Sequence, residues 1–220
     1  EINLSEVAPM VSLPHSPGNV RRVREVGPIK VAQVAIASCT NSSLRDLMMV
    51  AAILEGRTVS EDLHLTISPG SRQVVEHLAS SGGYTSMVRA GARIMENACG
   101  ACIGMGCAPR SEGVSVRTFN RNFEGRSGTK DAKVYLVSPE TAAATAINGY
   151  LTDPRDLGEA PKFEMPKKFF VNDNMIIKPL PEEEAQKIEI KRGPNIKPLP
   201  SFDPLGDTLT GKVLIKVGDN

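Results

Sequence analysis

Residues 31–56, VAQVAIASCTNSSLRDLMMVAAILEG, contain the pattern that decides the fold. The segment opens with a short, nearly continuous apolar run over residues 31–37, as expected for a buried parallel strand. Polar residues 41–43 then offer helix-capping side chains, and apolar residues recur at helical spacing from Leu44 to Ala51. A buried strand that leads directly into a helix is the repeating unit of a parallel α/β sheet.

The same alternation of strand and helix continues downstream. It predicts a three-layer α/β/α domain with a mainly parallel sheet, in which ligands gather beyond the carboxyl ends of the strands. The further strands are expected at residues 63–68, 92–95, 114–118 and 133–137, and the further helices at residues 72–81, 85–90 and 139–148.

The composition of the chain changes along its length and predicts three regions. Residues 1–28 are expected to be an N-terminal connector, and residues 29–155 the α/β domain. Residues 156–220 are rich in proline and charge, with poor apolar periodicity, which predicts an extended linker. Residues 213–217, VLIKV, look like one strand of a following domain, so we expect the chain to be a piece of a longer protein.

Charge and composition exclude several classes of partner. The chain has 26 basic and 25 acidic residues, six Phe, three Tyr and no Trp, so it lacks the basic face and stacking aromatics of nucleic-acid-binding proteins. No apolar run reaches the length of a membrane span. Because cysteines in CxxC spacing without a secretory signal are typical of metal or redox sites, we expect a reducing, cytoplasmic location and no membrane partner.

Three cysteines follow predicted strands. Cys39 lies in SCTNSS (residues 38–43), and Cys99 and Cys102 lie in NACGACIG (residues 97–104), so all three are expected at one rim of the sheet. Thiolate sulfur is the preferred ligand of iron–sulfur clusters. Three sulfur ligands rather than four would leave one iron with an open position, where it could act as a Lewis acid on a hydroxy acid.

Two further blocks complete a family pattern. FNRNFEGR (residues 119–126) and VSPE (residues 137–140), taken with the two cysteine segments, resemble the aconitase superfamily over about residues 29–150. The resemblance implies a 4Fe–4S cluster on the three cysteines, with Asn120 and Arg121 in the active site and Arg126 on a substrate carboxylate. Arginine suits that role because its planar fork meets a carboxylate through two hydrogen bonds.

The resemblance also implies an activity. Residues 41–43, Asn-Ser-Ser, favour the aconitase branch and hence the reversible isomerisation of citrate to isocitrate through cis-aconitate. Residues 120–128 and 136–144 look closer to the alternatives, the large subunits of isopropylmalate isomerase and homoaconitase. We expect the acid and base of the reaction in absent domains of the same protein, the last of them a swivelling domain, so no catalytic residue is assigned to this chain. In air-handled protein we expect the cluster to be lost.

Several residues leave alternatives open. Cys107 could join the other cysteines in a four-thiolate zinc site, or could simply be a packed thiol. A non-catalytic iron–sulfur or zinc module that senses redox state is a further alternative. Asn41 could donate a hydrogen bond toward cluster sulfur or cap its own loop. His15, His64 and His77 are expected to have packing or surface positions without a role in the site.

Overall fold

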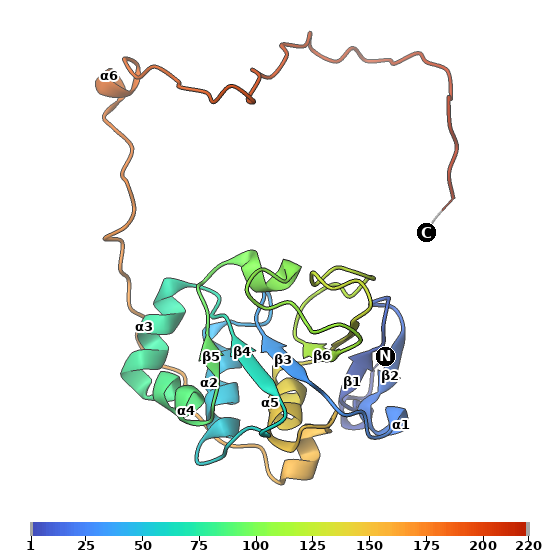
Figure 1. The fold of residues 1–220 in the computed structure, drawn as a ribbon. Coiled ribbons are helices and arrows are strands. Elements are labelled where there is room, and N and C mark those ends of the chain that lie inside the picture. The colour runs from blue at the N-terminus through green and yellow to red at the C-terminus, as the bar shows by residue number, and fades with distance from the viewer. Residues whose placement is uncertain (1, 219–220) are drawn as a thin grey trace. The chain divides into compact units, whose positions relative to one another are not determined.

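The computed structural model describes residues 2–218 and divides into two units, Glu1–Asp173 and Asn174–Asn220 (Figure 1). The first unit is an α/β domain built on a seven-stranded sheet with the order β2-β1-β7-β6-β3-β4-β5. Five strands run parallel, which confirms the predicted α/β class with a mainly parallel sheet. The strands are β1 (Met10–Ser12), β2 (Val20–Arg22), β3 (Gln33–Ile36), β4 (His64–Ile67), β5 (Arg93–Ile94), β6 (Val114–Arg117) and β7 (Lys133–Leu136).

The centre of the sheet places β3 between β4 and β6. Val34 is in register with Leu65 on one side and with Val116 on the other. Since these strands are parallel, the loops that follow them emerge at the same edge of the sheet. The two cysteine segments and the FNRNFEGR block therefore leave one edge, as the sequence predicts.

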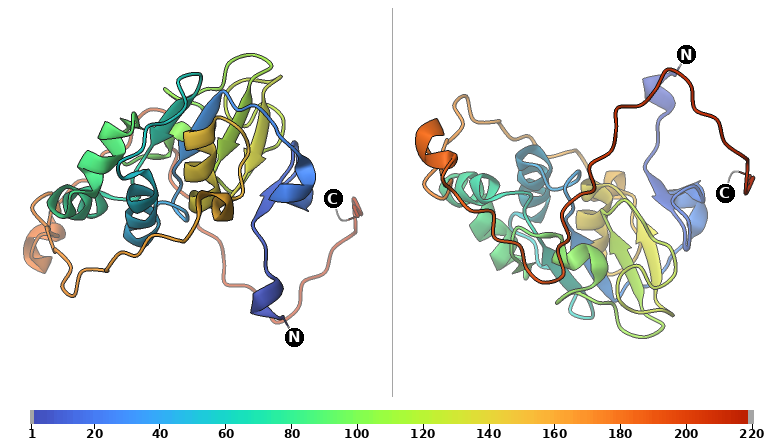
Figure 2. Two further views of the ribbon diagram at one scale, coloured as in Figure 1. Left: turned by 90° about the horizontal axis from the view of Figure 1, so that it is seen from below. Right: turned by 90° about the horizontal axis from the view of Figure 1, so that it is seen from above.

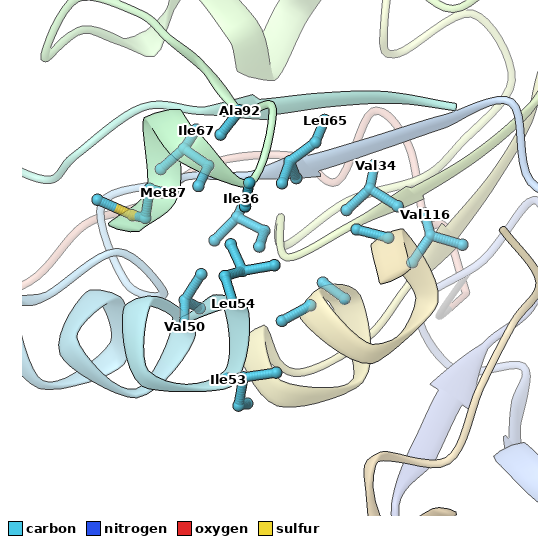
Figure 3. Close-up of a cluster of buried hydrophobic side chains, with 14 of the residues drawn as sticks. Val34, Ile36, Val50, Ile53, Leu54, Leu65, Ile67, Met87, Ala92 and Val116 are labelled. Carbon is cyan, nitrogen blue, oxygen red and sulfur yellow. The ribbon is translucent and has the colours of Figure 1, made fainter. Parts of the chain in front are cut away.

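Helices cover one face of this sheet. Two helices in particular, α2 and α5, lie side by side beneath the strands and enclose the main apolar core with Val34, Ile36 and Leu54 (Figure 3). The helices of the first unit are α1 (Val23–Val26), α2 (Leu44–Leu54), α3 (Arg72–Ser81), α4 (Gly83–Arg89) and α5 (Pro139–Asn148), with 3-10 turns η1 (Leu4–Glu6), η2 (Cys99–Ile103) and η3 (Pro154–Leu157).

Local sequence explains where the long helices begin. The Ser43 hydroxyl accepts the backbone N–H of Asp46, and the Asp46 carboxylate accepts that of Ser43, which forms a capping box at the start of α2. The Ser138 hydroxyl caps α5, and Pro139 occupies the first turn, where its missing N–H has no cost. Both helices start where the sequence predicts.

The opposite face of the sheet carries a second, smaller apolar cluster. Side chains alternate along a strand, so Ala35 and Ala37 point away from the helices that Val34 and Ile36 contact. They pack with Ala101, whose turn η2 covers this face together with the neighbouring loops. The site described below is built on this layer.

The N-terminal segment forms more structure than a connector. Strands β1 and β2 pair antiparallel, and Ser12 pairs with Leu136 of β7, so residues 10–22 extend the sheet at its edge (Figure 2). Each strand has only three residues, and in β1 only Val11 is buried. Such short strands give no alternating apolar pattern, which is why the sequence predicted no strands here.

The second unit is largely extended and exposed. Within residues 174–218 it contains one short helix, α6 (Glu182–Ala185), and its apolar side chains, such as Ile177 and Leu199, are open to solvent. The strand predicted at residues 213–217 does not form, because a lone strand has no neighbour to accept its hydrogen bonds. No helix among residues 2–218 is long and apolar enough to cross a membrane.

Candidate metal centre

Three of the four cysteines line one cavity. Cys39 follows β3, Cys99 opens η2, and Cys102 lies within η2, so the cavity of about 90 Å³ collects sulfur from two loops. All three thiols are free. The cavity is lined by Ser38, Cys39, Ser42, Ser68, Pro69, Gly70, Asn97, Ala98, Cys99 and Cys102.

The three thiols differ in their surroundings. Cys39 and Cys99 are exposed, whereas Cys102 is half-buried. Burial raises the pKa of the Cys102 thiol, and the nearby sulfur of Cys99 raises it further. The positive charges of Arg126 and Arg117 oppose this rise in the Cys102 pKa, so two arginines favour the thiolate form that binds metals.

The loop that carries Cys39 is held by serine hydroxyls. Ser38 has a φ of 106°, in the left-handed region that side chains rarely adopt. Its Oγ accepts the backbone N–H of Asn41 at 3.1 Å, and Ser42 Oγ donates to the Ser38 carbonyl at 2.6 Å. These bonds stabilise a turn in which Cys39 is exposed just above the end of β3.

The turn that carries Cys99 and Cys102 is tied to the end of β4. The Asn97 amide donates to the carbonyls of Pro69 at 2.8 Å and Ser71 at 3.2 Å. These bonds link the two cysteines to the loop after the neighbouring strand. Asn97 has a positioning role that the sequence did not predict, although it stands two residues before the first cysteine.

The loop expected to bind substrate lies directly against this turn. Gly104 ends η2 with a φ of 87°, and a Cβ added there would lie 2.0 Å from the carbonyl oxygen of Ser127. Only glycine allows the two backbones to approach this closely. The cysteine turn is therefore in backbone contact with the residue that directly follows the FNRNFEGR block.

The structure brings two of the three predicted substrate-binding residues to the cysteines. Asn120 Oδ1 accepts a hydrogen bond of 2.9 Å from Thr40 Oγ1, next to Cys39. The half-buried Arg126 is close enough to Cys102 to affect its pKa. Arg121 is exposed and has no hydrogen bond or ion pair within residues 2–218, so its guanidinium is available to a ligand.

A buried framework supports this loop. Asn122 is 0 % exposed, and its amide donates to the carbonyls of Leu13 at 2.9 Å and Val134 at 3.0 Å. Thr118 Oγ1 donates to the Ala37 carbonyl at 2.7 Å, which joins β6 to the end of β3. Asn122 thus shapes the loop, and the hairpin at residues 10–22 takes part in holding it.

Asn41 connects the same two strands. Its amide donates to the backbone carbonyl of Thr118, so one of its two N–H groups is used inside the protein framework. This contact fixes the Cys39 loop against the loop after β6. A hydrogen bond from Asn41 toward cluster sulfur stays a prediction.

Cys107 is separate from the three cysteines of the cavity. It is 5 % exposed, packs in the smaller apolar cluster, and its sulfur lies 3.6 Å from Gln33 Nε2. Residues 2–218 contain no group of three or more His, Cys, Asp or Glu side chains gathered closely enough to hold a single metal ion, and this includes Cys39, Cys99 and Cys102. Cys107 does not line the cavity of those three thiols, so the structure does not bring the four sulfurs of the zinc hypothesis to one cavity.

The histidines lie outside the site. His15 and His64 are exposed, whereas His77 is buried on α3. The His77 ring stacks on Phe170 with 4.3 Å between ring centroids, and its Nε2 accepts the Phe170 backbone N–H at 2.9 Å. Its role is to hold residues 169–170 against the domain.

The donor set fits an iron–sulfur cluster with three protein ligands. Three free thiols line one cavity, two of them exposed, and two arginines nearby offset negative charge. Thiolates are the ligands that such clusters require. Cys39, Cys99 and Cys102 are the residues that would hold the cluster.

Comparison with known proteins agrees with this arrangement. The sequence model of the Aconitase family (aconitate hydratase) matches residues 22–149, more than half of the chain. The chain is 42% identical over 159 residues to the 3-isopropylmalate dehydratase large subunit of a Thermoanaerobacter species. It is 45% identical over 161 residues to the homoaconitase large subunit of Thermus thermophilus.

A third relative is the 3-isopropylmalate dehydratase large subunit 1 of Thermotoga maritima, 44% identical over 158 residues. These matches cover 70–72% of the chain but only 38% of each relative. The chain therefore aligns with little more than a third of the length of these relatives. By the family model and by the fold and site described above, the chain belongs to the aconitase family.

Proposed function

We propose that this chain supplies the cluster-binding and substrate-binding part of an iron–sulfur hydro-lyase. The observation that carries the proposal is the single cavity lined by the three free thiols, with Arg126 beside it. The proposed reaction removes water from a hydroxy acid and adds it back, which moves a hydroxyl group between adjacent carbons.

The proposed substrate is 3-isopropylmalate or the hydroxy acid that a homoaconitase dehydrates. The sequence favoured citrate because of residues 41–43, but the curated relatives are named 3-isopropylmalate dehydratase and homoaconitase. They support the alternative better than the citrate prediction. 3-Isopropylmalate carries two carboxylates. Two arginines in one loop, Arg121 and Arg126, suit a ligand of this kind.

Each residue of the site has a defined part in this proposal. Cys39, Cys99 and Cys102 hold the cluster, which when bound would supply a Lewis-acidic iron for the substrate hydroxyl. Arg126, half-buried beside Cys102, binds a substrate carboxylate and orients the acid over the cavity. Arg121 approaches from solvent as the second carboxylate contact, and Asn120, fixed by Thr40, aligns the loop.

The two proton transfers of the reaction need an acid and a base. The residues that line the cavity include serines and cysteines but no carboxylic acid and no histidine. We therefore propose that the acid and base come from partner domains, either of the same protein or of a separate subunit. The relatives are named as large subunits, which supports a partner of this kind.

The test uses the intact protein, reconstituted anaerobically with iron and sulfide. We expect a brown protein with broad visible absorbance and turnover of 3-isopropylmalate or of the homoaconitate-type acid in preference to citrate. Citrate turnover alone would restore the original substrate prediction. A brown protein that turns over none of these acids would favour the redox-sensing alternative, and a colourless zinc protein would overturn the proposal.

A further inference from the structure

Arg117 is a buried cation without an acidic partner. It lies at the end of β6 on the face of the sheet that carries the site, and it is 0 % exposed. Its Nε donates to Ser115 Oγ at 2.9 Å, and its Nη2 donates to Gln33 Oε1 at 2.8 Å. Within residues 2–218 no carboxylate pairs with this guanidinium, although burying an unpaired charge is costly.

The other acceptors of Arg117 belong to the cysteine turn and the loop that follows it. Its Nη1 donates to the carbonyl of Ala101 at 2.9 Å, and its Nη2 donates to the carbonyl of Cys107 at 2.6 Å. Ala101 lies directly before Cys102. The guanidinium thus binds the segment from η2 to Cys107 at two points and fixes the backbone that presents Cys102.

The ionisable groups that act on this cation include no carboxylate among the described residues. The groups that act on the Arg117 charge are the thiols of Cys107 and Cys102 and the cation of Arg126, none of which is a carboxylate. Burial lowers the pKa of Arg117, and the two sulfurs oppose that change. A thiolate-ligated cluster at the cavity would add negative charge on this side of the arginine.

We propose that Arg117 is the built-in counter-charge of the cluster site, a positioning residue that fixes the cysteine turn and stabilises the negative charge of the bound cluster. The inference rests on the proposed function, because it requires the cluster. Gln33 and Ser115 seat the guanidinium from the neighbouring strand and from its own strand. The guanidinium also lies 5.1 Å from the ring centroid of Phe119, so it supports the start of the substrate loop.

Redox titration separates this role from simple packing. In the intact protein carrying its reconstituted cluster, Arg117→Gln removes the charge, and we expect a more negative reduction potential because the reduced cluster carries more negative charge. We expect the ratio of oxidised to reduced cluster at a fixed potential to change at least tenfold. For a one-electron couple this corresponds to a change in reduction potential of about 59 mV. Arg110→Gln, a change of the same charge at an exposed position, should leave the potential unchanged.

Arg117→Lys keeps the positive charge but cannot form the four hydrogen bonds of the guanidinium group. We expect a potential equal to that of the unmodified protein and faster loss of iron to a chelator, because the turn is held less firmly. If Arg117→Gln does not fold, Arg117→Lys alone tests the inference. A reduction potential displaced by about 59 mV in Arg117→Lys, or iron loss from it at the normal rate, would overturn the inference. An unchanged reduction potential in folded, cluster-bearing Arg117→Gln would also overturn it. Failure of the unmodified protein to assemble any cluster would instead overturn the proposed function.

Discussion

The four cysteines have different surroundings, and these decide which of them can serve a cluster. Cys102 is half-buried and within reach of the charges of Arg126 and Arg117, Cys39 and Cys99 are exposed on the same cavity, and Cys107 is packed in apolar surroundings. Metal binding requires loss of the thiol proton, so positive charge beside Cys102 favours binding. The exposed thiols leave the cavity accessible from solvent.

Serine substitutions test the ligand set. In the intact protein, Cys39→Ser, Cys99→Ser or Cys102→Ser should each abolish anaerobic cluster assembly, because a hydroxyl does not replace a thiolate toward iron. Cys107→Ser is the matched control and should assemble the cluster normally. Bound iron and visible absorbance are the measurements. Loss of the cluster in the Cys107 variant would show that the ligand set is wrong.

Arg126→Lys tests the carboxylate contact. Lysine keeps the charge but cannot form two parallel hydrogen bonds, and a charge-assisted contact is worth about 1.5–3 kcal/mol. We expect kcat/KM to fall roughly tenfold or more. Arg110→Lys, at an exposed position outside the site, is the control. Unaltered kinetics in Arg126→Lys would remove this residue from the substrate site.

Motifs predict the residues that touch ligands better than the residues that support them. Cys39, Cys99 and Cys102 could be predicted as ligands because the two cysteine segments and the blocks after them resemble one family, and the structure places all three thiols on one cavity. Arg117 could not be predicted as a supporting residue, because its hydrogen-bond acceptors come from Gln33, the cysteine turn and the loop after that turn. An arginine at the end of an apolar strand gives no sign of contacts so distant in the chain.

At the level of elements, the site depends on how η2 sits against the substrate loop. Gly104 permits that contact through its left-handed backbone and its missing side chain. The strands and helices of the parallel sheet are predictable from sequence because each buries a periodic apolar face. The hairpin of β1 and β2 is not, because its pairing with β7 leaves only Val11 buried in β1.

Gly104→Ala tests the contact between these elements. The substitution adds the cost of a left-handed alanine, about 1–2 kcal/mol, to a clash at 2.0 Å with the Ser127 carbonyl. Gly82→Ala is the matched control, since Gly82 has a φ of 83° and open space around its missing side chain. In urea unfolding, Gly104→Ala should lose more stability than Gly82→Ala and also lose the cluster more readily. Equal losses would mean that the contact with the loop is unimportant.

At the level of the whole molecule, Asp153 joins the two ends of the first unit. Its buried carboxylate binds Arg24 of α1 at 3.0 Å and Arg155 of η3. Hydrogen bonds from Arg155 are the largest cause that lowers the pKa of Asp153 below its ordinary value, and the charge of Arg24 adds to this. The stabilisation is therefore fully present above the unfolded pKa of about 3.9 and is lost as the pH falls through the folded value.

Asp153→Asn tests this connection. At pH 7 we expect the free energy of unfolding to fall by about 1–3 kcal/mol, because a charged hydrogen-bond acceptor is removed. The difference between the two proteins should shrink as the pH drops below about 4. Asp62→Asn breaks the exposed pair with Lys30 and should change stability much less. A difference for Asp153→Asn that persists at low pH would contradict the charge argument.

Excision tests how much of the enzyme this chain contains. We expect the isolated chain to unfold cooperatively, because the first unit has its own apolar core, but not to isomerise 3-isopropylmalate, the homoaconitate-type acid or citrate. The proposed acid and base come from partner domains, either of the same protein or of a separate subunit. Turnover comparable to that of the intact protein would show that both groups lie within residues 1–220.

The distance along the chain between Cys39 and Cys99 has a consequence for biogenesis. The two thiols meet only after β3 and β4 have paired and the turn η2 has docked, so a nascent or unfolded chain has no complete site. Metallation should therefore be the last event of maturation rather than a nucleus for it. A loaded cluster would then report that the sheet is correctly assembled, and the brown colour of an anaerobic preparation would give a lower bound on the fraction of chains that had folded.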